Sequence, residues 1–110
     1  MAKKKEEGIE LGVFDRLILL NILPKEGDFL TLKIVRHLRE ELSFTEAEHK
    51  ALQFVQEDGN VRWKSSADKP KAFDIGVKAT EIIVEVLKKL DKDKKLKDEH
   101  FGLYEKFVID

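Results

Sequence analysis

Apolar residues recur at intervals of three and four in two early segments, and this spacing predicts two helices. The first, residues 13–23, has apolar side chains on most sides, which indicates burial, and Pro24 ends it because proline lacks an amide hydrogen. The second follows Asp28, whose carboxylate can accept hydrogen bonds from the first turn. Its apolar face contains Phe29, Leu32, Val35, Leu38 and Leu42. We expect both helices to contribute to the core.

The sequence TEAE predicts the start of a third, short helix near residues 46–52. Thr45 can accept a hydrogen bond from the backbone amide of Glu48, and the Glu48 side chain can accept one from Thr45, which together form a capping box.

Beyond this helix the spacing changes to that of strands. Asp58 and Gly59 favour a two-residue turn with positive backbone angles, which predicts a hairpin over residues 53–64 with Phe54 opposite Trp63. A short strand at residues 72–75 is expected to join this hairpin, because a two-stranded hairpin alone is marginally stable.

Two further helices complete the pattern, one long helix after Gly76 and a last one near residues 98–108. The apolar stripe of the long helix contains Ala79, Ile83, Val86, Leu87 and Leu90. The predicted fold class is α+β and mostly α, with about five helices and a small antiparallel sheet. Residues 1–8 are expected to be a flexible tail and residues 9–110 a single compact domain.

Composition excludes several kinds of chemistry. The chain has no cysteine, so disulfides, thiolate metal sites and thiol catalysis are ruled out, and a reducing cytoplasm fits. Its most apolar run, residues 17–23, is far shorter than the ~20 residues that a membrane span needs. The formal net charge of -1 gives no overall field that would attract nucleic acid or anionic lipid, so only a local patch could do so.

Three helices followed by a hairpin, over residues 13–64, resemble the order of elements in winged-helix DNA-binding domains. In such domains the third helix enters the major groove, where phosphates favour positive charge. Residues 40–61 instead contain six acidic residues and one basic residue, which gives -5. We therefore expect that this helix does not bind DNA.

Residues 62–97 have the opposite balance, eleven basic and six acidic residues, or +5. Lysines near a helix C-terminus complement its dipole and keep the surface soluble, which is the simpler interpretation. The alternative hypothesis is a nucleic-acid-binding regulator that uses this patch. Its candidate residues are Arg62, Lys64, Lys88, Lys89, Lys92, Lys94 and Lys95. The opposite charges of the two regions also suggest that one copy could bind another.

No motif for catalysis, a metal or a cofactor is present in the sequence. His37, His49 and His100 are far apart and match no metal-ligand spacing, the glycines form no phosphate-binding loop, and adjacent carboxylates diverge on a helix. We expect a protein that is not an enzyme and has no cofactor.

The stretches RLILLNILPKEGDFLTLKIVRHLREELSFTEAEHKAL, IGVKATEIIVEVLKKL and HFGLYEKFV are similar to a group of small uncharacterised proteins encoded by tailed bacteriophages. They consist of core and capping patterns. The resemblance implies a location in the host cytoplasm or the virion and no defined activity.

The leading interpretation is a small protein-interaction module, a phage accessory or regulatory protein that associates with a protein partner or with itself as a homodimer. Its candidate contact residues are Ile82, Ile83, Val86 and Tyr104, because the long and the last helix have more apolar side chains than one core face needs.

Overall fold

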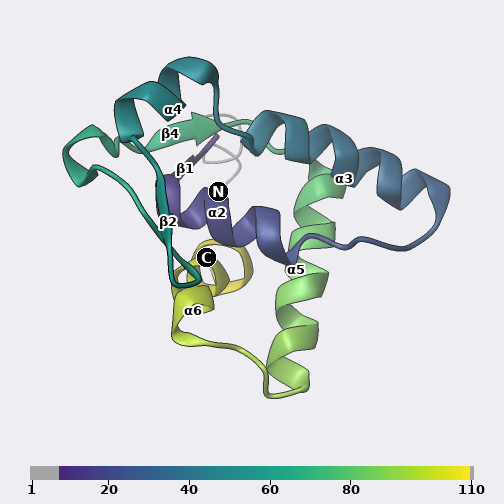
Figure 1. Cartoon of the computed structure of the whole chain (residues 1–110). Helices are drawn as coiled ribbons and strands as arrows, with labels where there is room; N and C mark the ends of the chain where they lie inside the picture. Colours follow the sequence, from purple (N-terminus) through teal and green to yellow (C-terminus); the bar gives the residue numbers. More distant parts are fainter. Residues whose placement is uncertain (1–7, 110) are drawn as a thin grey trace.

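The computed structural model describes residues 8–109 and shows five α-helices with two small antiparallel sheets (Figure 1). The elements are β1 (Ile9–Leu11), α2 (Val13–Ile22), α3 (Phe29–Leu42), α4 (Glu46–Leu52), β2 (Val55–Glu57), β3 (Asn60–Arg62), the 3-10 turn η1 (Ser65–Ala67), β4 (Lys71–Phe73), α5 (Val77–Lys92), α6 (Asp98–Tyr104) and the π-helical turn η2 (Glu105–Ile109). The predicted α+β, mostly α class is confirmed. The expected tail lies outside the described residues except for Gly8.

The core lies where α2, α3 and α5 meet, with α6 and the β1–β4 sheet closing its sides. Its fully buried large side chains are Leu11, Leu19, Leu42, Ile83, Leu87 and Leu103. Helix α2 supplies apolar residues on several faces, as the sequence indicates, because other elements cover it on several sides (Figure 1).

The predicted helix starts are confirmed. The Asp28 carboxylate accepts a hydrogen bond from the Thr31 amide at 2.8 Å. At the start of α4, Thr45 and Glu48 exchange the two bonds of a capping box, at 3.1 and 2.8 Å. These contacts fix where α3 and α4 begin, because they satisfy amides that have no partner inside the helix.

The hairpin is also confirmed in its turn and its register. Asp58 and Gly59 have φ values of 48° and 78°, as a two-residue turn of this kind requires. Gln56 pairs with Val61, which places Phe54 opposite Trp63, and their ring centroids are 6.2 Å apart.

The expected third strand exists but has another partner. β4 pairs with β1, Ile9 opposite Phe73, and not with the hairpin, so there are two two-stranded sheets in place of one sheet. Gly8 shows how close this pairing is: its φ is +85°, and a Cβ there would lie 2.8 Å from the carbonyl oxygen of Phe73. The strand covers Lys71–Phe73 and not residues 72–75. Phe73 is buried, and Ile75, just after the strand, is partly buried and packs against the core.

The winged-helix outline is not confirmed. Helices α2, α3 and α4 precede the hairpin in the expected order, but within residues 8–109 the hairpin pairs with no additional strand. Both of its strands are exposed along their whole length, so the hairpin is fixed mainly at its base.

Asp68 makes the connection at that base. One carboxylate oxygen accepts a hydrogen bond from the Trp63 indole at 3.1 Å, and the other accepts one from the Val13 amide at 3.1 Å. The Val13 amide belongs to the first turn of α2, where the N-cap residue Gly12 has no side chain to serve as acceptor. Asp68 therefore caps α2 from a distant part of the chain and holds Trp63 beside it.

We expect Asp68→Ala to lower the free energy of unfolding by about 1–2 kcal/mol, because it removes a helix cap and leaves a partly buried indole N–H unpaired. Urea denaturation followed by Trp63 fluorescence measures this. Asp74→Ala, which removes an exposed carboxylate near β4, is the matched control and should stay within about 0.5 kcal/mol of wild type. Equal effects of both substitutions would contradict the bridging role.

Candidate functional site

The apolar stripe of α5 packs into the core of the molecule. Ile83 and Leu87 are fully buried, and Ile82 and Val86 are partly buried, with Ile82 packed against the core. The prediction that Ile83 lies on a contact surface is therefore wrong, because α3 and η2 cover the face of α5 from which Ile83 extends. The surplus of apolar side chains inferred from sequence is used inside the molecule.

Tyr104 is half-buried against the core, and its hydroxyl donates a hydrogen bond to the Asp91 carboxylate at 3.1 Å. Partial burial and the neighbouring Asp91 raise the pKa of the Tyr104 hydroxyl. The ring therefore joins α6 to the end of α5.

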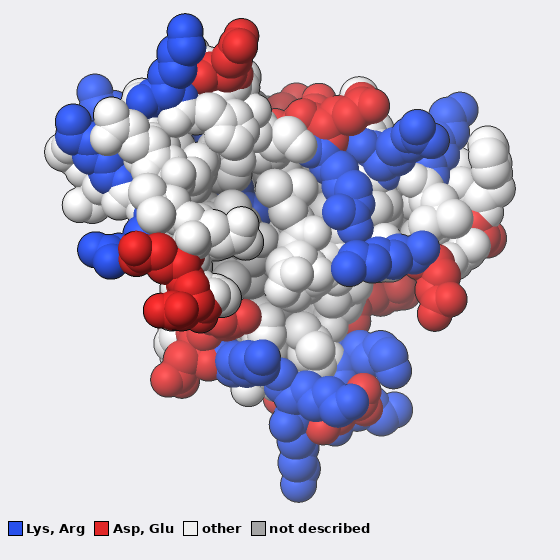
Figure 2. Space-filling model, viewed as in Figure 1, with Lys and Arg blue, Asp and Glu red and all other residues white. Residues whose placement is uncertain are grey.

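The lysines of the alternative nucleic-acid hypothesis are all exposed. Lys64 lies at the base of the hairpin, just before η1. The others lie at or just after the C-terminal end of α5, and they are Lys88, Lys89, Lys92, Lys94 and Lys95. Basic side chains gather at that end in Figure 2, with acidic ones among them. Lys89 pairs with Asp93 at 3.4 Å. Arg62 pairs with Glu57 at 3.3 Å on the hairpin, which lies on the other side of the molecule in Figure 1. The structure does not bring the two basic groups together.

The three histidines also stay apart. His37 lies exposed beside Glu41, at 3.4 Å, and His49 packs against Phe54, with ring centroids 5.5 Å apart. His100 is buried, and its Nδ1 accepts a hydrogen bond from the Lys97 amide at 3.0 Å. In the part of the chain that the structure describes, no three His, Cys, Asp or Glu side chains are grouped to hold a metal ion.

A buried arginine, not expected from the sequence, organises the junction of α2, α3 and α4. Arg16 is 2% exposed. It binds both Glu48 oxygens, at 2.7 and 3.1 Å, and donates to the Leu42 and Ser43 carbonyl oxygens at 3.1 and 2.9 Å. Its guanidinium carbon lies 3.9 Å from the centroid of the Phe44 ring. Arg16 thereby satisfies two carbonyls at the end of α3 and fixes the position of α4.

The Arg16 guanidinium lowers the pKa of the Glu48 carboxyl to about 2, and the Thr45 amide contributes in the same direction. A pKa below that of the unfolded chain means that this pair stabilises the fold fully above about pH 4.5 and loses its effect as the pH falls towards 2. Glu48 thus serves a structural purpose, and its charge is balanced by Arg16.

We expect wild type to lose more stability between pH 5 and pH 2 than Glu48→Gln does. The difference should be about 1–2 kcal/mol, since solvent contact of the carboxylate screens part of the interaction. Urea denaturation at a series of pH values measures it. Parallel curves for the two proteins would show that Glu48 does not carry this dependence.

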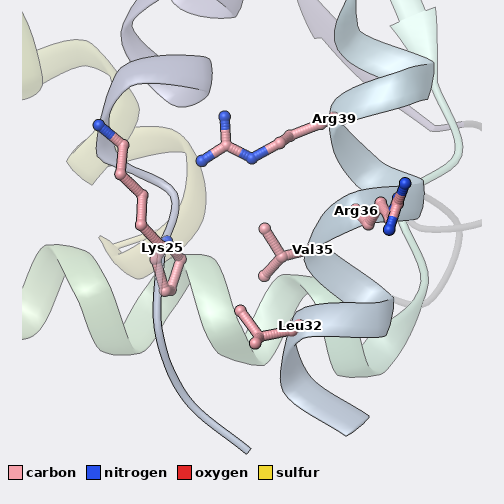
Figure 3. Close-up of a pocket in the computed structure, with 6 residues that line it drawn as sticks. Lys25, Leu32, Val35, Arg36 and Arg39 are labelled. Carbon is pink, nitrogen blue, oxygen red and sulfur yellow. The ribbon is translucent and has the colours of Figure 1, made fainter. Parts of the chain in front are cut away.

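An open groove of about 420 Å³ lies between the loop after α2 and one face of α3. We name it the α3 groove, and it is lined by Pro24, Lys25, Leu32, Val35, Arg36 and Arg39. In Figure 3 Leu32 and Val35 point into it and Lys25 and Arg39 approach it from opposite sides, while Arg36 extends from the other flank of α3. Its lining combines apolar side chains with three cations and no carboxylate.

Arg39 is held in position by the end of α2. Its guanidinium donates long hydrogen bonds, 3.4 Å each, to the carbonyl oxygens of Leu20 and Leu23. These leave Lys25 and Arg36, both exposed, as the cations best able to contact another molecule.

The first turn of α3 extends beyond the core, which corrects the sequence prediction for this helix. Val35, Leu38 and Leu42 are buried as expected, but Phe29 is 81% exposed and Leu32 37% exposed. Figure 1 shows the reason, because this end of α3 extends past α5 to the edge of the molecule. Leu30 is 62% exposed on the same turn. We call Phe29 and Leu30 the free end of α3.

Comparisons with protein-family models, with curated proteins and with solved structures found no match. Among the helices of residues 8–109, none is both long and apolar enough to cross a membrane.

Proposed function

We propose that the chain is a small non-enzymatic protein-interaction module whose contact surface is the free end of α3 with the adjoining α3 groove. The observation that supports this most directly is the exposure of Phe29 and Leu30, at 81% and 62%, on one helical turn. Exposed apolar patches on a small domain are costly in water and commonly mark binding surfaces. The resemblance to small tailed-phage proteins fits an accessory or regulatory protein of the host cytoplasm.

The α3 groove adds a further apolar residue and charged residues to this surface. Leu32, 37% exposed, continues the apolar surface from the free end into the groove, and Lys25 and Arg36 form its charged rim. An apolar centre with a polar rim is the usual arrangement of protein interfaces. A large side chain at the centre contributes most of the binding energy in such interfaces, which makes Phe29 the expected main contact.

The proposal is tested with a paired variant, Phe29→Ser with Leu30→Ser. Affinity capture from host extract and light scattering across a concentration series should both show weaker association, by about tenfold or more. Phe101→Ser is the matched control, because Phe101 is 66% exposed on α6, away from α3, and its loss should leave association unchanged.

Two results would contradict the proposal. One is a protein that stays monomeric at all concentrations and captures no partner. The other is association that survives the paired substitution. A salt-dependent mobility shift with DNA or RNA that depends on Lys94 and Lys95 would support the nucleic-acid alternative.

A further inference from the structure

The two ends of the molecule carry opposite exposed charges. The hairpin tip, Glu57 and Asp58, is exposed and acidic, and the α3 groove is basic. In Figure 2 acidic side chains lie on the left over the end of the hairpin, and basic ones gather on the right over α3 and the loop before it, where acidic side chains also lie. Each surface is thus accessible while the other is occupied.

From this placement we infer that the α3 groove binds the hairpin tip of a second copy of the chain, head to tail. The inference rests on the proposed function, since it uses the same surface and names its partner. The charges match in sign: Glu57 and Asp58 would meet Lys25 and Arg39, which approach the groove from opposite sides, with Arg36 on the flank of α3. No carboxylate lines the groove.

The form of the groove and the apolar residues beside it are compatible with this contact. A hairpin closed by two residues is narrow at its tip, and the groove is open along one side of α3. Val61, 39% exposed, lies next to the tip and would supply an apolar side chain for Leu32. The pair between Glu57 and Arg62 does not prevent this contact, because exposed ion pairs of this kind contribute little and exchange readily.

Head-to-tail contact has a consequence that a symmetric dimer lacks. Because groove and tip lie on different sides of one copy, each bound copy still offers one free groove and one free tip, so association continues into short chains. The contact is mainly between charges at the rim of an interface, so salt should weaken it strongly.

The test uses the full chain and two neutralised variants. The groove variant carries Lys25→Gln and Arg36→Gln, and the tip variant carries Glu57→Gln and Asp58→Asn, since asparagine tolerates the positive φ of residue 58. A third protein, Lys94→Gln with Lys95→Gln, changes the net charge as the groove variant does but at exposed positions elsewhere. Circular dichroism and thermal unfolding are used to check that all of them fold.

Sedimentation equilibrium at low salt should show wild type and the Lys94/Lys95 protein associating equally, and added salt should dissociate both. The groove variant alone and the tip variant alone should each associate at least about tenfold more weakly than wild type. An equimolar mixture of the groove and tip variants should form dimers that grow no further, because only one intact groove and one intact tip meet in each pair.

Wild type that stays monomeric at low salt overturns the inference, and so does a mixture that forms no dimers although wild type associates. The inference is also overturned if the groove variant loses association while the tip variant associates as strongly as wild type, because the groove then binds another surface. In that case, or if wild type is monomeric but captures a partner through Phe29 and Leu30, the proposed function remains.

Discussion

Arg16→Met should lower the free energy of unfolding by about 3 kcal/mol, because removing one member of a buried ion pair leaves the other charge without its partner. The substitution also removes the hydrogen bonds that Arg16 donates to the Leu42 and Ser43 carbonyl oxygens, so more than one ion pair is lost. The Arg16 side chain is 3% exposed and Glu48 25%, so water can replace little of what is lost at the arginine. Urea denaturation at neutral pH gives the value.

Two further variants separate charge from packing at this junction. Arg16→Lys keeps the charge but cannot form the bidentate pair with Glu48, so its free energy of unfolding should lie between those of wild type and Arg16→Met. Adding Glu48→Gln to Arg16→Met should recover part of the loss, because it removes the unpaired carboxylate. Arg36→Met, at an exposed position of α3, should stay within about 0.5 kcal/mol of wild type. An Arg16→Met protein as stable as this control would show that the buried pair has no structural role.

Ile83→Ala should lower the free energy of unfolding by about 3–4 kcal/mol, the usual cost of removing most of a buried aliphatic side chain. Ile83 is 0% exposed at the centre of the core, where α5 meets α3. Val77→Ala is the matched control on the same helix, because Val77 is 64% exposed, and it should change stability by less than about 0.5 kcal/mol.

The same pair of variants decides between a core and an interface role for this face of α5. If Ile83 contributed to a protein contact, Ile83→Ala would weaken association and leave the unfolding of the monomer nearly unchanged. Thermal unfolding and sedimentation measured on the same samples distinguish these results.

Features set by neighbouring residues could be predicted from the sequence. The Asp28 cap, the capping box of Thr45 and the turn at Asp58 and Gly59 each depend on residues within three positions, and all are confirmed. The hairpin register followed as well, because a two-residue turn fixes which residues face each other.

Features set by distant parts of the chain could not be predicted in the same way. Ile9–Leu11 is too short to show an alternating pattern, and its partner begins about sixty residues later, at Lys71. Periodicity predicts that Val35, Leu38 and Leu42 are buried, as they are, but it cannot show that the first turn of α3 extends past α5, which leaves Phe29 uncovered.

Arg16 had a signal that the hydrophobic pattern alone does not use. It is an arginine in the segment 13–23, whose pattern predicts burial on most sides, and a buried arginine requires acceptors. The sequence predicts the bond between Glu48 and Thr45, but both Glu48 oxygens also accept hydrogen bonds from Arg16. A charged residue within an apolar segment therefore predicts a buried partner elsewhere in the chain.

The pairing of β1 with β4 limits which parts of this chain can be isolated. Ile9 and Phe73 are joined across the whole helix–hairpin region, so during synthesis the segment from β1 to the hairpin must wait for residue 73 before its first strand has a partner. A fragment truncated after the hairpin would expose the unpaired edge of β1 together with Leu11, which is normally buried, and we expect such a fragment to aggregate.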